Sequence, residues 1–155
     1  MSEITASSTL QSETTSRSWS ALPLGLGLGV LAMLIGAVLW GVIAYFTDTV
    51  YFIIPLGIGF TVASALLLPF KKKSIGLVVI LFVPSALLTI ASALLGDYLY
   101  YTLVYAREAA VALPESASFI ARNFVEIATE SPDTAKSIGL AAVGALLGLI
   151  NAVRS

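Results

Sequence analysis

Three long stretches of this chain contain no charged residue. They cover residues 21–47, 49–70 and 74–96, and a fourth, shorter stretch covers 137–153. A helix of about 20 apolar residues crosses the hydrocarbon core of a bilayer, which is about 30 Å thick. The chain is 58% hydrophobic and only 11% charged, whereas a soluble domain is about 25% charged. The sequence therefore predicts an all-α integral membrane protein, a bundle of four transmembrane helices of which the fourth is short.

The chain divides into a polar tail and a membrane domain. Residues 1–20 are rich in Ser and Thr and poor in apolar residues, so we expect a disordered Ser/Thr-rich tail. A cleaved signal peptide is the less favoured alternative, because the following apolar run is too long and lacks a cleavage site. The membrane domain covers 21–155, with spans at about 21–47, 50–70, 74–96 and 137–153 and an extramembrane segment at 97–136.

Between the third and fourth spans, residues 115–130 have the pattern of a short amphipathic helix. Pro114 and Glu115 suit its first turn, and Ser131 with Pro132 would end it. Apolar residues repeat at helical spacing on one face, and charged residues occupy the other. The apolar stripe comprises Phe119, Ile120, Phe124 and Ile127. We expect this helix to be a partner or interface helix, lying on the membrane surface or over the helix ends. The last span, 137–153, is at the lower limit for a crossing, and a re-entrant helix is its alternative.

The distribution of basic residues predicts the orientation. Lys71, Lys72 and Lys73 lie directly between the second and third spans, and basic residues mark the cytoplasmic side. The segment 97–136 carries three basic and six acidic residues. With four crossings, both termini are expected in the cytoplasm and 97–136 on the outer side. The three lysines would set this topology whether or not they also bind anionic lipid.

Composition excludes several classes of function. The chain has no Cys and no His, which removes thiolate and imidazole nucleophiles and the usual zinc and haem ligands. Its net charge is −1 and its largest basic cluster is 71–73, so nucleic-acid binding is not expected. No residue pattern indicates a catalytic, metal or cofactor site. Membrane lipid is the expected surrounding, with another membrane protein or a second copy of the chain as partner.

Small residues at four-residue spacing mark candidate helix-packing sites, because they let helix backbones approach closely in lipid. Packing within the bundle is the favoured interpretation, and a dimer or partner interface is the alternative. Pro55 with the two following glycines also has the alternative of an unwound, substrate-lining segment. The glycines at four-residue spacing are Gly25 and Gly29, and Gly144 and Gly148; the two glycines after Pro55 are Gly57 and Gly59.

The segments GAVLWGVIAYFT (36–47) and IIPLGIGFTVASAL (53–66) resemble a group of small uncharacterised bacterial multi-pass membrane proteins. These share a Gly- and Trp-containing helical hairpin followed by a third and often a fourth helix. The resemblance implies this architecture and a bacterial cytoplasmic membrane, and it implies no activity. The chain departs from the pattern in its three lysines, in Pro55 and in its long acidic segment.

The favoured function is that of a non-enzymatic multi-pass membrane protein, as accessory subunit, scaffold or partner-binding module. The alternative is an oligomeric pore, channel or small transporter, lined by hydroxyls at helical spacing on the third span. These are Ser85, Thr89 and Ser92. A lipid-directed enzyme using Asp48 and Asp97 ranks last, since both acids are expected to lie in ordinary polar turns at span ends.

Overall fold

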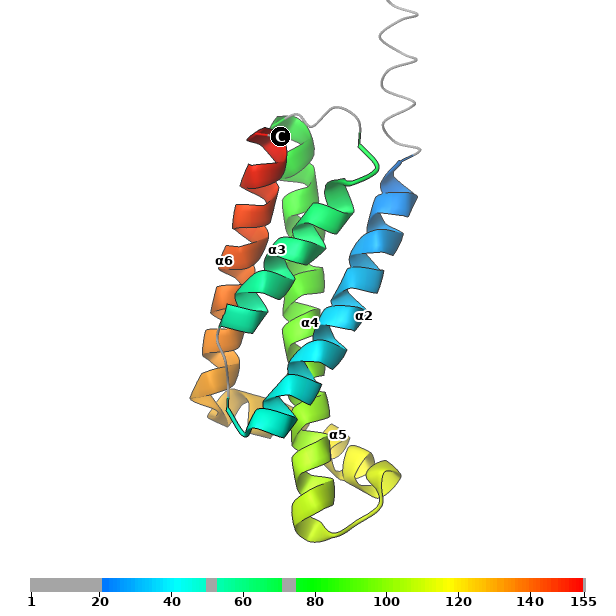
Figure 1. Ribbon diagram of the computed structural model, residues 1–155, viewed down its shortest axis with the longest axis vertical. Coiled ribbons are helices and arrows are strands. Elements are labelled where there is room, and N and C mark those ends of the chain that lie inside the picture. The colour runs from blue at the N-terminus through cyan, green and yellow to red at the C-terminus, as the bar shows by residue number, and fades with distance from the viewer. Residues whose placement is uncertain (1–20, 50–52, 71–74, 155) are drawn as a thin grey trace, which may run out of the picture.

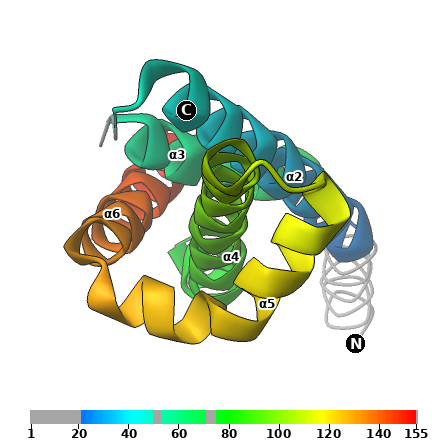
Figure 2. The same cartoon turned by 90° about the horizontal axis from the view of Figure 1, so that it is seen from below.

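The computed structural model describes residues 21–49, 53–70 and 75–154, and these residues are almost entirely helical and contain no strand. Four helices run alternately along a bundle, so that the start of α2 and the end of α6 lie at the same end (Figure 1). The fifth, α5, lies across the opposite end, here called the α5 end (Figure 2). The helices are α2 (Leu22–Thr47), α3 (Ile53–Leu67), α4 (Ile75–Ala109), α5 (Leu113–Glu130) and α6 (Pro132–Arg154). The prediction of an all-α bundle is confirmed.

The helices α2, α4 and α6 are long and apolar enough to cross a membrane, whereas α3 is shorter. With 15 residues, α3 is about 22 Å long. The fourth apolar helix was predicted to be the short one. In the structure α3 is the short one instead, because α6 has 23 residues and begins at Pro132. Proline is favoured in the first helical turn. Because α6 begins at Pro132, its first turn is polar, and the prediction from apolar residues alone left this turn out.

The helix α4 continues past the end of the span expected at 74–96 and has 35 residues. Its last turns support α5, whose apolar stripe lies against them. Phe124 contacts Tyr98 edge to face, with ring centroids 5.6 Å apart, and Phe119 stacks on Tyr105 at 4.5 Å. Ile120 is buried. The amphipathic helix thus packs over the end of its own bundle.

Glycines bring α3 and α6 into backbone contact. A Cβ atom on Gly59 would overlap the carbonyl oxygen of Ala141, and one on Gly144 would overlap that of Leu56. On Gly148 it would lie 2.7 Å from the carbonyl oxygen of Phe60. Real Cβ atoms do not approach other atoms so closely, so this contact depends on glycine at these positions.

The other candidate packing glycines differ among themselves. A Cβ on Gly25 would lie 2.6 Å from the carbonyl oxygen of Leu66, and one on Gly29 would lie 2.8 Å from the Leu66 side chain. Nothing lies within 4 Å of a Cβ on Gly57. The helix α3 runs unbroken through Pro55 and Gly57, so this segment is not unwound. The predicted tail 1–20 and Lys71, Lys72 and Lys73 lie outside the described residues.

We expect Gly59→Ala to lower the free energy of unfolding by about 1–3 kcal/mol, the usual cost of overpacking. The methyl group would force α3 away from Ala141 on α6. Chemical unfolding in detergent measures the effect. Gly57→Ala, two residues away in open space, is the control; it should leave stability unchanged or raise it by up to about 1 kcal/mol. If both substitutions lowered the free energy of unfolding equally, this account of the α3–α6 contact would be wrong.

Candidate functional site

A buried hydrogen bond joins α2 to α4 near the α5 end of the bundle. The indole Nε1 of Trp40 donates to Oδ1 of Asp97 over 2.9 Å. Trp40 is 1% exposed and Asp97 is 6% exposed. A carboxyl group removed from water requires such a donor, because burial without one is costly. The bond therefore makes an ionisable residue compatible with the interior of this bundle.

Two glycines allow this bond to form. A Cβ on Gly96 would overlap the Trp40 ring, and a Cβ on Gly41 would lie 2.7 Å from the carbonyl oxygen of Gly96. Glycine at both positions lets α2 and α4 approach until the indole reaches the Asp97 carboxyl. Gly96 is thus a packing residue within α4.

The prediction that Asp97 lies in a polar turn at the end of a span is wrong, because α4 continues for three further turns. Asp48 does end its helix, in a left-handed conformation with φ 47° that Asp tolerates better than most residues. Its carboxylate pairs with Arg107 at 3.2 Å, and the guanidinium also lies over the Tyr45 ring. The bond to Asp48 raises the pKa of Arg107 further above its ordinary value, so Arg107 stays cationic.

A cavity of about 230 Å³ lies beside Asp97, between α2, α4 and α6. We call it the Asp97 cavity. Its other acidic residue, Asp133, pairs with Lys136 at 3.2 Å. The lining residues are Trp40, Ala44, Asp97, Tyr100, Tyr101, Asp133, Thr134 and Ser137. The cavity combines carboxyl and hydroxyl oxygens with three aromatic rings and contains no basic side chain in its lining.

The hydroxyl residues considered as a pore lining lie in the interior of a single chain. Ser85, Thr89 and Ser92 have no exposed surface. The Ser92 hydroxyl donates to the carbonyl oxygen of Met33 on α2 over 2.9 Å. Together with Asp97 these residues form a polar row along the inner side of α4, and the row ends at the Asp97 cavity.

A second hollow, of about 490 Å³, is a groove between α2 and α3. Its lining is apolar apart from Thr61, whose hydroxyl donates to the carbonyl oxygen of Gly57 over 2.9 Å. Gly57 lies in this groove with open space around it. The lining residues are Leu28, Leu31, Ala32, Ile35, Gly36, Leu39, Ile43, Ile54, Gly57, Ile58 and Thr61. We call this the α2–α3 groove.

Sequence reasoning missed the pairing of Trp40 with Asp97 and the polar residues Thr134 and Ser137. The continuation of the third helix past Asp97 was predicted, because Tyr98, Tyr101 and Tyr105 recur at helical spacing directly after it. The partner on α2 is 57 residues away, and no pattern in a single sequence connects the two.

Within the described residues, no group of three or more His, Cys, Asp or Glu side chains is placed to hold a metal ion. Asp48 and Asp97 have different partners and do not form an acid pair. Comparisons with protein-family models, with curated proteins and with solved structures find no match to this chain.

We expect Trp40→Phe to destabilise the protein mainly by leaving Oδ1 of Asp97 without its donor. Hydrogen bonds to charged groups contribute about 1.5–3 kcal/mol, so the two residues should show strong coupling. A double-mutant cycle with Asp97→Leu, read by chemical unfolding in detergent, measures that coupling. If Trp40→Phe costs the same with Asp97 as with Leu at position 97, the bond contributes nothing to stability.

Proposed function

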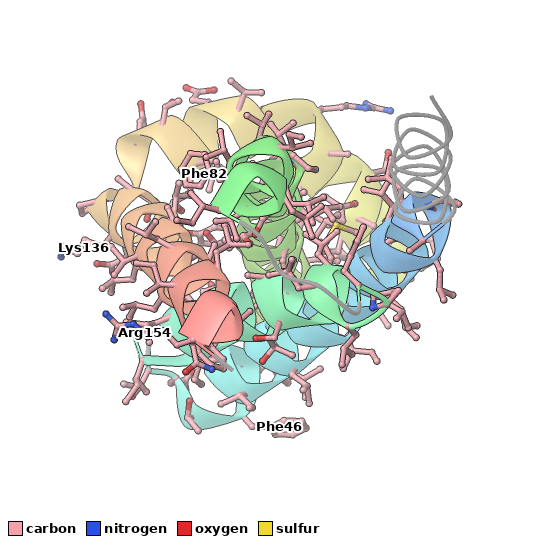
Figure 3. All side chains as sticks on the ribbon, turned by 90° about the horizontal axis from the view of Figure 1, so that it is seen from above. Phe46, Phe82, Lys136 and Arg154 are labelled. Atoms are coloured by element: carbon pink, nitrogen blue, oxygen red, sulfur yellow. The ribbon has the colours of Figure 1, made fainter. Side chains whose placement is uncertain are left out.

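We propose that this chain is a non-enzymatic multi-pass membrane protein that serves as an accessory subunit, scaffold or partner-binding module. The observation that carries the membrane setting is the apolar outer surface of the three long helices. Large apolar side chains are exposed along all of them, and Phe46 projects away from the bundle (Figure 3). A soluble monomer rarely exposes such continuous apolar surface. Exposed examples are Leu31, Leu34, Ile35, Val38 and Leu39 on α2, Val79, Ile80, Val83 and Leu87 on α4, and Val143, Leu146, Leu147 and Ile150 on α6.

The polar groups of the described chain support a definite placement in the bilayer. The ion pairs Arg107–Asp48 and Lys136–Asp133 both lie at the α5 end. Here α5 would rest in the interfacial region with its charged face toward water. By the positive-inside rule, the lysines at 71–73 favour a cytoplasmic location for the opposite end of the bundle and for both termini. The resemblance of the first hairpin to bacterial proteins favours a bacterial cytoplasmic membrane.

The α2–α3 groove is the best candidate surface for a partner. It is open and apolar, and it exposes backbone at Gly57, where no contact among the described residues requires glycine. Glycine lowers helix stability relative to alanine, whereas an exposed glycine lets a neighbouring transmembrane helix approach closely. We propose that a transmembrane helix of another protein occupies this groove.

The pore alternative has weaker support. Ser85, Thr89 and Ser92 would have to line a path between subunits, yet they have no exposed surface in the single chain. Such a pore requires the bundle to open. The lipid-directed enzyme is the least supported function, because its two candidate acids pair with different residues, Asp48 with Arg107 and Asp97 with Trp40.

The membrane setting predicts a definite pattern of cysteine labelling, since the chain contains no Cys. In intact cells, a membrane-impermeant thiol reagent should label Thr49→Cys and Ser118→Cys and should not label Ser12→Cys or Ser155→Cys. Permeabilised cells provide the control, because all four variants should then react. Labelling of Ser155→Cys in intact cells would contradict the four-crossing arrangement.

The groove predicts position-dependent photocrosslinking. A photoreactive probe on Leu31→Cys, which lines the groove, should give a discrete protein adduct in native membranes. Gly57→Leu should fill the groove and reduce the adduct at least about tenfold, the effect of losing about 1.4 kcal/mol of binding. Gly27→Leu is the matched control, because Gly27 also has open space around it but lies outside the groove lining. Adducts to lipid alone would contradict a protein partner, and a dimer adduct would identify a second copy of the chain as the occupant.

A further inference from the structure

Asp97 is a buried carboxyl group with hydrogen-bonding neighbours on two other helices. Its Oδ1 accepts the indole N–H of Trp40 on α2 over 2.9 Å, and the hydroxyl of Thr134 on α6 is its second neighbour. Asp97 is 6% exposed and Thr134 is 4% exposed. The carboxyl group of one residue therefore connects α2, α4 and α6 at the level of the Asp97 cavity.

The surroundings of Asp97 do not compensate a negative charge. Among the residues that the structure describes, no Lys or Arg belongs to the lining of the cavity, and Asp133 would repel a carboxylate. The side chain of Lys136 pairs with Asp133 and projects outward from the bundle (Figure 3). Trp40 supplies a single N–H. An ionised carboxyl in such a place is costly, because it needs an opposite charge or several donors in place of water.

A protonated carboxyl group fits the same surroundings. It has one acceptor oxygen and one O–H donor, and the two neighbours of Asp97 are an N–H donor, on Trp40, and a hydroxyl oxygen, on Thr134. A neutral carboxyl can accept from the first and donate to the second. Both of its oxygens then have a partner, as buried polar atoms in folded proteins almost always do.

We propose that Asp97 is a proton-binding switch that holds α6 against α4. In the protonated state Oδ1 accepts from Trp40, and the O–H at Oδ2 donates to Oγ1 of Thr134. Both Oδ2 and Oγ1 are enclosed, so the proton reaches water only when the first turns of α6 move away from α4. The proton then passes to water in the cavity, whose volume of about 230 Å³ exceeds the 30 Å³ or so of one water. Loss of the proton at rising pH and displacement of α6 are therefore one event.

Three other ionisable side chains of the described chain line the cavity with Asp97. They are Tyr100 and Tyr101 on α4 and Asp133 on α6. The lining residues of α2 do not ionise, and α3 and α5 contribute none. Comparison of the wild-type chain with Asp97→Asn at each pH cancels the contributions of these other groups. The amide keeps an acceptor oxygen and an N–H donor, and it cannot ionise.

Infrared spectroscopy tests the protonation directly, because a protonated carboxyl and a carboxylate absorb at different frequencies. The chain contains three Asp residues, and the other two, Asp48 and Asp133, form exposed ion pairs. In the full chain, isotopically labelled at the Asp carboxyl carbon, we expect an isotope-sensitive band of a protonated carboxyl at neutral pH. The band should vanish in Asp97→Asn and shift in Thr134→Val, which removes the acceptor. Absence of the band from the wild-type spectrum would overturn the proposal without any variant.

The pH dependence of unfolding in maltoside micelles provides a second test. In the unfolded chain Asp97 is ionised at neutral pH, whereas the folded chain keeps the proton, so the folded state binds one proton more. The unfolding equilibrium constant of the wild type should therefore rise with pH, by up to about tenfold per pH unit relative to Asp97→Asn. Asp48→Asn, at an exposed ion pair outside the cavity, is the matched control and should keep this slope. Parallel profiles of the wild type and Asp97→Asn would overturn the proposal.

The proton also sets the strength of the bond between Trp40 and Asp97. At neutral pH this bond joins two neutral groups, and it becomes a bond to a charged group, which is stronger, only when Asp97 ionises. The coupling measured by the Trp40–Asp97 double-mutant cycle should therefore increase with pH. A coupling that does not change with pH would contradict the proposal.

Cysteine labelling tests the movement of α6, since the chain contains no Cys. Ser137 on α6 is 1% exposed and lines the cavity. The labelling rate of Ser137→Cys should rise with pH more steeply than that of the exposed Ser118→Cys, which reports the ionisation of a thiol alone. With Asp97→Asn added, the two rates should rise in parallel; unchanged steepness would overturn the switch. If Asp97→Asn does not fold, Thr134→Val decides: it should raise the labelling of Ser137→Cys at neutral pH, and an unchanged rate would overturn the switch.

Discussion

The contact between α2 and α4 at Trp40 and Asp97 determines how the two ends of this bundle differ. Its indole–carboxyl bond is 2.9 Å long and buried on both sides. On one side of it the helix interfaces contain mainly apolar side chains and isolated hydroxyls. On the other side lie the cavity, the ion pairs and α5. The bond thus marks the level at which the bundle changes from an apolar structure to a polar one, and two glycines give the helices the separation that it requires.

Close backbone contact is the second constraint, and it follows from the surroundings proposed for the chain. Lipid is as apolar as the outer side chains, so burying leucine against leucine contributes little to helix association in a bilayer. Helices in a bilayer associate instead through close contact between their backbones, which small residues make possible. The α3–α6 interface at Gly59, Gly144 and Gly148 has this character. It holds the shortest of the apolar helices against α6, which is long and apolar enough to span a membrane.

Much of the fold could be predicted from hydropathy, because uninterrupted apolar runs and the residues that separate them define the helices. The amphipathic helix was also predictable, since Ile120 and Phe124 repeat at the helical period and Pro114 stands at its start. Helix ends were less predictable. A charged residue after an apolar run resembles a boundary, yet Asp97 is stabilised inside α4 by a partner on another helix. The polar first turn of α6 has no apolar signal at all.

The candidate site was largely beyond sequence analysis for a physical reason. Its members come from three helices, and their proximity depends on the rotation of each helix about its axis. Gly96 and Gly144 are chemically identical in the sequence, but one accommodates an indole ring and the other a carbonyl oxygen. Gly57 resembles Gly59 in the pattern, but a Cβ on Gly57 would have no atom of a neighbouring element of the described chain within 4 Å. Only the packed helices distinguish a glycine that is required from one that is free.

The junction of α5 and α6 consists of a single residue, Ser131, whose hydroxyl accepts a hydrogen bond from Tyr101 over 3.1 Å. So short a junction leaves the two helices little freedom to turn independently. The first turns of α6 carry Thr134 and Ser137, which form one wall of the Asp97 cavity. A movement of α5 away from the end of α4 would therefore also displace the first turns of α6, and with them one wall of the Asp97 cavity.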